Sequence, residues 1–404
     1  MNKILLITLS GQDQPGITAG ATALLAAQGV NVLDIGQSVI HASLTIGLLL
    51  ELPDALEEAA VLTGLETFAG EHGLQLHASD VSADSYGAWV DAQGRARYIV
   101  TLLARKITAE HLARVSSVIA RFQLNIDSIS RLSGRIPLGD VPPLSKACVE
   151  FSVRGPVPDP LAFRSELLEV SSELEMDLAF QEDNRYRRTR RLVVFDMDST
   201  LIEAEVIDEL ATVAGVGQEV SAITERAMRG ELDFSESFRR RVALLRGLPE
   251  SELAAIAAGL KVTEGAGHLI NTLRALGYKT AILSGGFTYF AERLRQELGI
   301  DYVHANVLDI EDGKVTGDVR EPIVDGERKA QLLRELAEEQ GISLEQVIAV
   351  GDGANDLPML GIAGLGVAFR AKPLVKQSAE QSISTLGLDA ILYLLGIGDR
   401  HQGY

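Results

Sequence analysis

Three short apolar runs, each followed at once by polar or glycine-rich residues, constrain the fold of the C-terminal half of the chain. They are Leu192–Phe195, Thr280–Leu283 and Val347–Val350, and sequence typical of helices separates them. Buried strands that alternate with helices are typical of a doubly wound parallel sheet with helices on both faces. We therefore predict an α/β domain over residues 191–404.

Polar clusters follow these predicted strands. Asp196 and Asp198 come after the first strand, Ser284-Gly285-Gly286 after the second, and Gly351-Asp352-Gly353-Ala354-Asn355-Asp356 after the third, with Lys329 between the last two. Each cluster alone could be structural, as an acidic turn, a plain turn or a solvated lysine. Because ligands of open α/β sheets bind at the carboxyl ends of the strands, the four clusters in this order predict one shared site.

The side chains in these clusters suit phosphoryl transfer. Asp196 would attack phosphorus and form an aspartyl-phosphate, and Asp198 would protonate the leaving alkoxide and later deprotonate a water molecule. Lys329 and the Ser284 hydroxyl would bind phosphate oxygens. A carboxylate and a phosphate repel each other, so we expect Mg²⁺ bound by Asp196, Asp352 and a carbonyl oxygen, with Asp198 completing the predicted metal-binding set.

Between about residues 204 and 262 the sequence has helical patterns and no strand signal. An insertion of this kind directly after the first catalytic strand would form a helical cap that excludes water from the site.

The first 184 residues repeat one pattern of elements. In the first copy we predict strands at 3–10, 31–40, 43–52 and near 74–79, with helices at 17–28 and near 55–72. In the second copy we predict strands at 98–103, from Asn125, at 146–153 and at 176–181, with one helix marked by Leu112, Val115, Ile119 and Phe122 and another at 160–174. Each copy is a ferredoxin-like βαββαβ unit. The expected domains are residues 1–82 and 95–184, joined by a link over 81–96 and followed by a solvated linker containing Arg185, Arg187, Arg188, Arg190 and Arg191.

Composition limits the partners and the compartment. The net charge of −19 without a long basic block argues against nucleic acid or an anionic membrane as the main partner. Cys148 is the single cysteine, so it forms no internal disulfide, and a reducing compartment fits. No run approaches the ~20 apolar residues that span a bilayer, and the N-terminal apolar stretch is too short for a signal peptide, so we expect a cytoplasmic protein.

The four clusters resemble the motifs of the haloacid dehalogenase superfamily, with a closer match to its phosphoserine phosphatases, from about Arg191 to the end of the chain. The similarity extends to Asp198–Glu205, Met228–Gly230, Phe234, Phe238–Val242, Leu248-Pro249, Asp312–Gly317 and Phe369–Pro373. The resemblance implies hydrolysis of O-phospho-L-serine, the last step of serine biosynthesis, with Asp196 as nucleophile, Asp198 as acid/base and Asp352 as a Mg²⁺ ligand.

It also implies which residues hold the substrate. Glu205 and Arg241 would bind its amino acid part, Ser284, Gly285 and Lys329 would bind its phosphate, and Asn355 would bind either part. A guanidinium can grip a carboxylate with two parallel hydrogen bonds, and a carboxylate can receive an ammonium. The alternative is that Glu205 and Arg241 form a salt bridge within the cap.

The two N-terminal units resemble ACT domains, regulatory modules that often bind amino acids between copies. Asp13-Gln14-Pro15-Gly16 lies between a strand and a helix, where Asp13, Gly16 and helix N–H groups could receive an amino acid effector such as serine. The second unit has Ala104-Arg105-Lys106-Ile107 there, which puts ligand binding by this copy in doubt. Dimerisation without a ligand is the alternative. We expect a homodimer, and a tetramer stays open.

Two other functions stay open. One is a phosphatase of the same superfamily for another small ester, such as a phosphosugar, phosphoglycolate or a different phospho-amino acid. The other is an amino-acid sensor with a vestigial phosphatase domain, against which the intact Asp196, Asp198, Lys329 and Asp352 argue. A P-type ion pump is excluded, because Met197 stands where pumps have lysine and membrane spans are absent.

Overall fold

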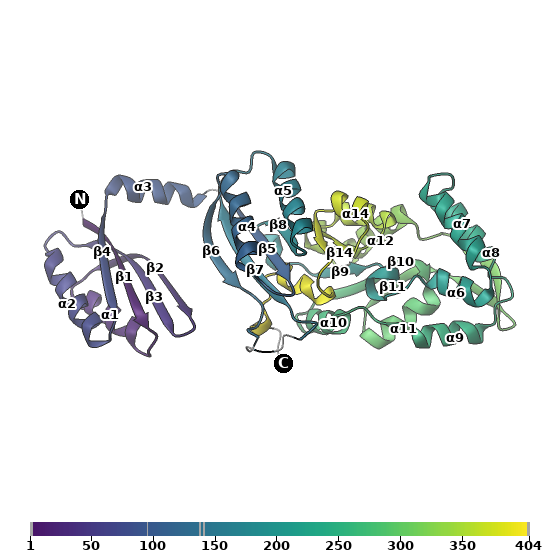
Figure 1. The fold of residues 1–404 in the computed structure, drawn as a ribbon, viewed down its shortest axis with the longest axis horizontal. Coiled ribbons are helices and arrows are strands. Elements are labelled where there is room, and N and C mark those ends of the chain that lie inside the picture. The colour runs from purple at the N-terminus through teal and green to yellow at the C-terminus, as the bar shows by residue number, and fades with distance from the viewer. Residues whose placement is uncertain (1–2, 95, 137–138, 140–141, 402–404) are drawn as a thin grey trace. The chain divides into compact units, whose positions relative to one another are not determined.

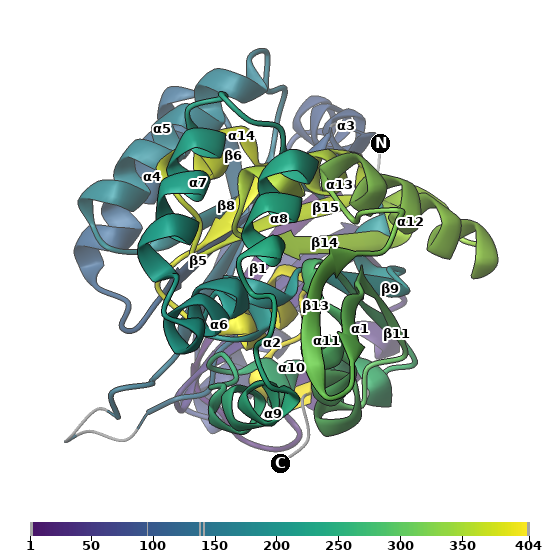
Figure 2. The same cartoon turned by 90° about the vertical axis from the view of Figure 1, so that its right-hand side faces the viewer.

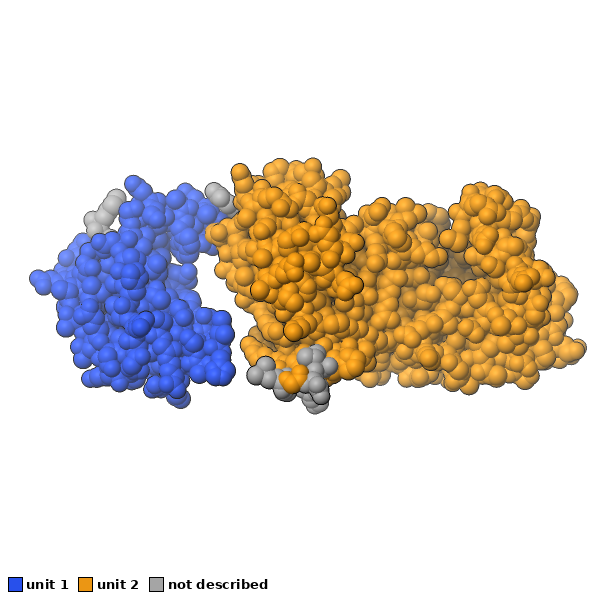
Figure 3. Space-filling view, viewed as in Figure 1, with its two compact units in different colours: residues 1–95 blue, residues 96–404 orange. Residues whose placement is uncertain are grey.

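The computed structural model describes residues 3–94, 96–136, 139 and 142–401. The chain divides into two compact units, Met1–Arg95 and Ala96–Tyr404 (Figure 3). Among the described residues, no helix combines the length and the apolar composition that a bilayer crossing requires.

The first unit is a four-stranded antiparallel sheet in the order β2-β3-β1-β4, with two helices on one face (Figure 1). Its elements are β1 (Lys3–Gln12), α1 (Ile17–Ala27), β2 (Asn31–Ile40), β3 (Ser43–Leu52), α2 (Glu58–Glu71) and β4 (Gln75–Val81). Leu5, Ile7 and Leu9 of β1 alternate toward the helices and form the core with apolar residues of α1 and α2. The predicted βαββαβ pattern is confirmed.

The link after β4 contains a helix that was not predicted. Helix α3 (Ala83–Asp91) begins after Ser82, whose hydroxyl accepts a hydrogen bond from the Ser85 amide at 3.1 Å. None of its residues is buried. Tyr86 and Trp89 share one turn of helical spacing, but the Ser, Asp and Gly residues around them are typical of a link.

The second unit opens with another antiparallel sheet of the same kind, in the order β6-β7-β5-β8. Its elements are β5 (Arg97–Ala104), α4 (Ala109–Arg121), β6 (Asn125–Arg131), β7 (Ala147–Arg154), α5 (Pro160–Glu173) and β8 (Asp177–Glu182). Cys148 lies on β7, buried and free, as expected. Both repeats therefore have the predicted element order.

The rest of the second unit is built on a six-stranded parallel sheet in the order β11-β10-β9-β14-β15-β16. The strands are β9 (Leu192–Phe195), β10 (Lys279–Phe287), β11 (Tyr302–Asn306), β14 (Val347–Gly351), β15 (Leu365–Phe369) and β16 (Gln381–Ile383). Val193 and Phe195 face one apolar cluster, and Leu192 and Val194 face the other. The helices on its faces are α10 (Ala266–Ala275), α11 (Thr288–Leu298), α12 (Gly326–Glu339), α13 (Leu357–Ile362), α14 (Pro373–Ser378) and α15 (Ile391–Leu394). The predicted doubly wound sheet is confirmed.

A helical cap follows β9. It consists of α6 (Val206–Ala214), α7 (Gly217–Met228), α8 (Phe234–Ala243) and α9 (Glu250–Gly259), which Figure 2 shows together in front of the sheet. A hairpin of β12 (Leu308–Glu311) and β13 (Lys314–Val319) supports it, since the Gly247 amide donates to the Val315 carbonyl. Asp312 and Gly313 both have positive φ, the conformation of a tight two-residue hairpin turn.

The arginine-rich segment between β8 and β9 differs from the solvated linker we predicted. Arg187 is 1% exposed and pairs with Glu150 of β7, and Arg190 is 5% exposed and donates to the Gly364 carbonyl at 3.0 Å. Burial, and secondarily Arg187, lowers the pKa of Arg190 to about 10. The segment is a packed joint, and the second ACT-like repeat and the parallel sheet belong to one compact unit.

Side chains complete this joint. The Gln381 amide group on β16 accepts from the Phe180 N–H at 2.9 Å and donates to the Phe180 carbonyl at 2.7 Å. The Asp177 carboxylate accepts from the Ser384 and Thr385 amides at 2.9 and 2.7 Å. Edge strand β8 is thereby covered by the neighbouring sheet.

Candidate active site at the carboxyl ends of the central strands

The central strands bring the predicted clusters together. Strand β9 pairs in parallel with both β10 and β14, so the carboxyl ends of all three strands lie at one edge of the sheet. Asp196 directly follows β9, Ser284 lies near the end of β10, and Asp352 directly follows β14. Segments more than 150 positions apart in the chain thus form one site, as the alternation of strands and helices predicted.

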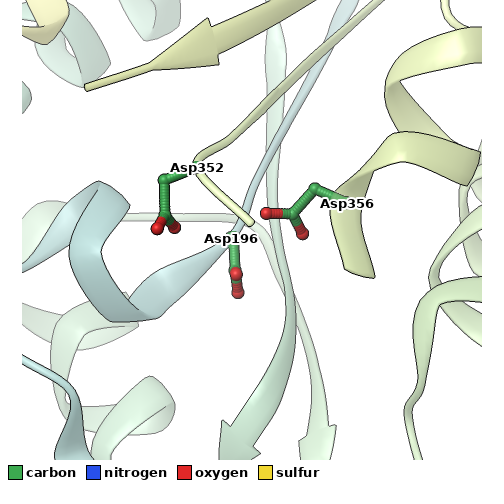
Figure 4. Close-up of side chains that lie close together, drawn as sticks. All are labelled: Asp196, Asp352 and Asp356. Carbon is green, nitrogen blue, oxygen red and sulfur yellow. The ribbon is translucent and has the colours of Figure 1, made fainter. Parts of the chain in front are cut away.

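Three carboxylates converge at this edge (Figure 4). Oxygen atoms of Asp196, Asp352 and Asp356 all lie within 4.8 Å of one another. The sequence motif assigns no role to Asp356, although its position four residues after Asp352 is a signal that could have marked it. Asp198, which we included in the metal-binding set, is not part of this carboxylate group.

Lys329 supplies a fixed positive charge between two of these acids. It lies in the first turn of α12, is fully buried, and its Nζ is 3.0 Å from Asp196 Oδ1 and 2.7 Å from Asp356 Oδ1. Burial by itself lowers the pKa of Lys329, but Asp196 and Asp356 outweigh burial and raise it. The ammonium therefore stays protonated and holds both carboxylates in place.

One lysine does not neutralise three acids. Burial first, and then the charges of Asp196 and Asp356, raise the pKa of Asp352 to about 7. A cation would relieve this repulsion, and the donor set of carboxylate oxygens is the kind that hard divalent ions prefer. The residues present therefore fit a metal ion.

Asp198 has the environment of a proton donor. Its Oδ1 is buried and has no hydrogen-bond partner within the described residues. Burial, then the charges of Glu205 and Asp196, raise the pKa of Asp198 well above its usual range. A Cβ at Gly286 would lie 3.1 Å from Asp198 Oδ2 and 2.7 Å from Met197 Cε, so glycine at position 286 leaves room for the Asp198 carboxyl and for Met197.

The end of β10 offers hydrogen-bonding groups to the site. Ser284 is fully buried, and its Oγ accepts from the Gly286 amide at 3.0 Å. The Gly285 carbonyl accepts from Asn306 Nδ2 at 2.9 Å, and Asn306 Oδ1 accepts from the Val324 amide at 2.7 Å. Asn306 thus ties β10 to the segment that leads into α12. Sequence reasoning missed it, because a lone asparagine after a strand carries no signal.

Asn355 lies on the turn between Asp352 and Asp356 and is half-buried. The Gly353 amide donates to Asp356 Oδ2 at 2.9 Å, which closes this turn. The sequence therefore places Asn355 at the edge of the carboxylate group.

The cap carries Glu205 and Arg241. Glu205 directly precedes α6 and accepts from the Ser199 hydroxyl at 2.8 Å. Arg241 lies on α8, and burial lowers its pKa, while the nearby acids Asp208, Glu205 and Asp198 oppose this effect. In the part of the chain that the structure describes, no salt bridge joins Glu205 to Arg241, so the alternative of a salt bridge within the cap has no support.

Aromatic contacts hold α8 over the strand ends. The Phe234 and Phe238 rings stack with centroids 5.9 Å apart, and Phe238 contacts Phe287 of β10 at 5.5 Å. A Cβ at Gly285 would lie 2.9 Å from Phe234 Cζ. Arg241 follows Phe234 and Phe238 at helical spacing and so shares the face of α8 that meets the strand ends.

The first unit has a separate concave site. Asp13 and Gly16, the predicted effector residues, line a cavity of about 440 Å³ together with Gln37 and the first turn of α1. Gly16 has φ 97°, a conformation that favours glycine, and Thr18 Oγ1 donates to Gln37 Oε1 at 2.7 Å.

Comparisons with known proteins agree with this architecture. The family model of haloacid dehalogenase-like hydrolases matches residues 190–364, and two ACT domain models match residues 3–79 and 96–181. A phosphoserine phosphatase of Streptomyces coelicolor is 42% identical over 393 residues, which cover 97% of this chain and 92% of the relative.

Two further proteins are similar over most of their length. Phosphoserine phosphatase SerB2 of Mycobacterium tuberculosis is 41% identical over 398 residues, 97% of this chain and 93% of that protein. A crystal structure of a probable phosphoserine phosphatase from Vibrio cholerae, unliganded, aligns with a TM-score of 0.59 at 34% identity and covers 77% of this chain and 90% of that one. The chain therefore belongs to the phosphoserine phosphatase family of haloacid dehalogenase-like hydrolases, with two ACT domains before the hydrolase domain.

Proposed function

We propose that this protein hydrolyses O-phospho-L-serine to L-serine and phosphate through an aspartyl-phosphate on Asp196. The observation that carries the proposal is the Asp196 carboxylate, held by Lys329 among further acids at the strand ends, beneath a cap that bears Glu205 and Arg241. The names of the full-length relatives support the same substrate.

The reaction uses Asp196 as nucleophile and Asp198 as proton donor and acceptor. Asp196 attacks phosphorus, the ester P–O bond breaks, and the serine oxygen takes the proton that the raised pKa keeps on Asp198. Asp198, now a carboxylate, takes a proton from water as the water attacks the phosphoryl group. The P–O bond to Asp196 then breaks, which releases phosphate and restores both acids.

Mg²⁺ is the proposed cofactor, and Asp196, Asp352 and a carbonyl oxygen would hold it, with Asp198 as the remaining residue of the predicted set. When bound, it would screen the charge between the attacking carboxylate and the phosphate. Asp356 would orient the site without binding the ion, because it pairs with Lys329 at 2.7 Å and accepts a hydrogen bond from the Gly353 amide. Mn²⁺ accepts the same oxygen ligands, so assays with each ion decide the preference.

Substrate recognition divides between cap and core. Glu205 would receive the ammonium of serine and Arg241 its carboxylate. Arg241 is half-buried, and Glu205 is the more exposed of the two. Ser284, Gly285 and Lys329 would bind the phosphate, and Asn355 would contact either part. A partly desolvated guanidinium such as that of Arg241 disfavours substrates that leave it unpaired, which favours an amino acid ester over a phosphosugar.

A panel of phosphomonoesters tests the proposal. Phosphoserine, phosphothreonine, phosphoglycolate, a phosphosugar and p-nitrophenyl phosphate are assayed with Mg²⁺, with Mn²⁺ and with EDTA. We expect the highest kcat/KM for phosphoserine and no turnover in EDTA. A higher kcat/KM for any other ester would contradict the substrate assignment, and full activity in EDTA would contradict the metal assignment.

We also propose that the cavity beside Asp13 and Gly16 binds an amino acid effector such as serine. A loop followed by a helix N-terminus suits a ligand carboxylate, and the cavity of about 440 Å³ has room for one. Isothermal titration of serine into the full chain should show a binding event that Gly16→Val removes, because a Cβ at φ 97° distorts the loop. Identical heats for both proteins would contradict this site.

A homodimer is the proposed assembly. Strand β2 is an edge strand with an exposed apolar series, in which Val32, Ile35, Val39 and Ile40 are 45%, 49%, 40% and 76% exposed. Edge strands with this character favour pairing with another chain. Sedimentation of the wild type and of Ile35→Lys should give a dimer and a weakened dimer, and a monomeric wild type would contradict the proposal.

A further inference from the structure

The loop between the first strand and the first helix makes different contacts in the two ACT domains. In the first domain, the loop between the first strand and first helix lines the effector cavity. In the second domain, the corresponding loop carries Arg105, whose Nη1 and Nη2 donate to Glu264 Oε1 and Oε2, both at 2.7 Å. This is a bidentate pair in which both side chains are largely shielded, at 29% and 18% exposed.

The Arg105 loop itself is held in place by its own domain. The Ser145 hydroxyl donates to the Arg105 carbonyl at 2.9 Å. Glu264 is held equally firmly on the hydrolase side, since the Leu388 amide donates to its carbonyl at 2.8 Å. The Arg105–Glu264 pair therefore joins two segments whose backbones are each held by hydrogen bonds within this unit.

Glu264 directly follows a segment that supports the catalytic loop. Ile202 and Val262 form an antiparallel bridge, the Glu203 amide donates to the Lys261 carbonyl, and the Thr263 amide donates to the Leu201 carbonyl, the last two at 2.9 Å. Backbone hydrogen bonds thus connect the residue that Arg105 grips to the loop that follows Asp198.

A second route runs through Arg370, a residue of the Phe369–Pro373 motif to which the proposed reaction gives no role. Arg370 donates to Glu264 Oε2 at 3.0 Å and lies 3.4 Å from Glu203 Oε1. The Glu264 carboxylate thus connects Arg105 with Arg370 and, through it, with the catalytic loop.

The loop that both routes reach carries Asp198 and Glu205. The Ser199 amide donates to the Ala204 carbonyl at 3.1 Å, and the Ser199 hydroxyl donates to Glu205. Ser199 has φ 55°, which a non-glycine residue adopts only when the surrounding structure imposes it. A shift of residues 201–203 therefore moves Glu205.

We propose that Arg105 is a positioning residue for substrate recognition: by gripping Glu264 it fixes the loop over residues 199–205 and so places Glu205 for the substrate ammonium. The inference rests on the proposed function, in which Glu205 receives that ammonium. In this inference, the loop between β5 and α4 attaches the second ACT domain to the hydrolase domain through Arg105.

The test compares Arg105→Met with Lys146→Met. Lys146 pairs with Asp389 at 2.5 Å in the same joint, and Asp389 packs against Gly265 beside Glu264. Within the described residues, however, no side-chain hydrogen bond or ion pair of Lys146 or Asp389 reaches Glu264, Arg370 or residues 199–205, so this control removes a neighbouring cation without releasing Glu264. Both variants remove one cation from the joint between the domains. KM and kcat are measured for phosphoserine and for p-nitrophenyl phosphate, which lacks the ammonium, together with the Tm of each variant.

We expect Arg105→Met to raise KM for phosphoserine roughly threefold to tenfold, with kcat/KM for p-nitrophenyl phosphate changed less than about twofold. Lys146→Met should lower Tm comparably and leave both KM values unchanged. Arg105→Lys should raise KM for phosphoserine less than Arg105→Met does, since an ammonium keeps one of the two hydrogen bonds. Arg105→Met combined with Glu264→Gln should raise KM no further than Glu264→Gln alone.

Equal kinetic effects of Arg105→Met and Lys146→Met would overturn the inference, as would equal losses for both substrates or an unchanged KM for phosphoserine. If Arg105→Met does not fold, Arg105→Lys against wild type carries the same comparison. The wild-type panel separates this test from the proposed function: a wild type that does not prefer phosphoserine refutes the substrate assignment, whatever the variants do.

Discussion

The three converging carboxylates predict that Asp352→Asn is stabilised relative to wild type when metal is absent and destabilised relative to wild type when metal is bound. Asp352 lies next to Asp196 and Asp356, and burial with these two charges raises its pKa from 3.8 to about 7. A group whose pKa is raised on folding contributes stability below its unfolded pKa, and this contribution is lost as pH rises through the folded value. Metal-free wild type therefore loses stability between about pH 4 and pH 8.

The magnitude follows from the two pKa values. At 1.36 kcal/mol per pH unit, the interval from 3.8 to about 7 corresponds to about 4 kcal/mol, of which roughly 2.5 kcal/mol falls between pH 5 and pH 8. Partial exposure of Asp352 reduces this to about 1–2.5 kcal/mol. Asp352→Asn removes the charge, so its stability relative to wild type should increase by that amount between pH 5 and pH 8, about 1–4 °C in Tm for a compact unit that spans Ala96–Tyr404.

Thermal unfolding in EDTA and in Mg²⁺, at pH 5 and pH 8, measures the effect. In EDTA the variant should gain on wild type as pH rises, whereas in Mg²⁺ at pH 8 the wild type should be the more stable, because a bound ion stabilises the state that binds it. Asp318→Asn, at a side chain 72% exposed, is the matched control and should show neither trend. A difference in EDTA that does not change with pH would refute the reasoning.

Three further predictions concern turnover. Asp196→Asn should lower kcat by at least about 1,000-fold and keep the wild-type circular dichroism spectrum, because an amide is a poor nucleophile; activity within tenfold of wild type would contradict the covalent mechanism. Arg241→Ala should raise KM for phosphoserine roughly 10- to 100-fold, the loss of a charge-assisted pair, with kcat/KM for p-nitrophenyl phosphate nearly unchanged; equal losses for both esters would point to a structural role in the cap. Gly286→Ala should lower kcat for both esters, because its Cβ would lie 2.7 Å from Met197 Cε and 3.1 Å from Asp198 Oδ2; wild-type kcat in this variant would show that the proton donor tolerates displacement.

The strands and most helices could be predicted because each has a local apolar pattern. Strand β9 is four fully buried residues in a row, and α4 buries Val115, Val118 and Ile119 at helical spacing. Helix α3 was missed because Ser82, Asp84 and Gly87 are typical of a link and its apolar spacing covers a single turn.

Contacts between distant segments could not be predicted from such patterns. The charges of Arg187 and Arg190 predict exposure to solvent, yet both side chains are buried in the joint. Arg187 pairs with Glu150, and Arg190 donates to the Gly364 carbonyl. Asn306, which ties β10 to the segment before α12, likewise has partners that no local spacing indicates.

The sequence by itself determined the chemistry available to this protein: apolar strands that end in Asp196, Ser284 and Asp352 bring acids and a hydroxyl to one edge of a sheet, since parallel strands share that edge. Only the tertiary structure decided which charges meet, namely that Lys329 lies between Asp196 and Asp356 and that Arg105 grips Glu264. The reason is physical. Secondary structure follows from the periodic burial of neighbouring residues, whereas a contact between side chains distant in the chain depends on the packing of whole elements, which no single segment encodes.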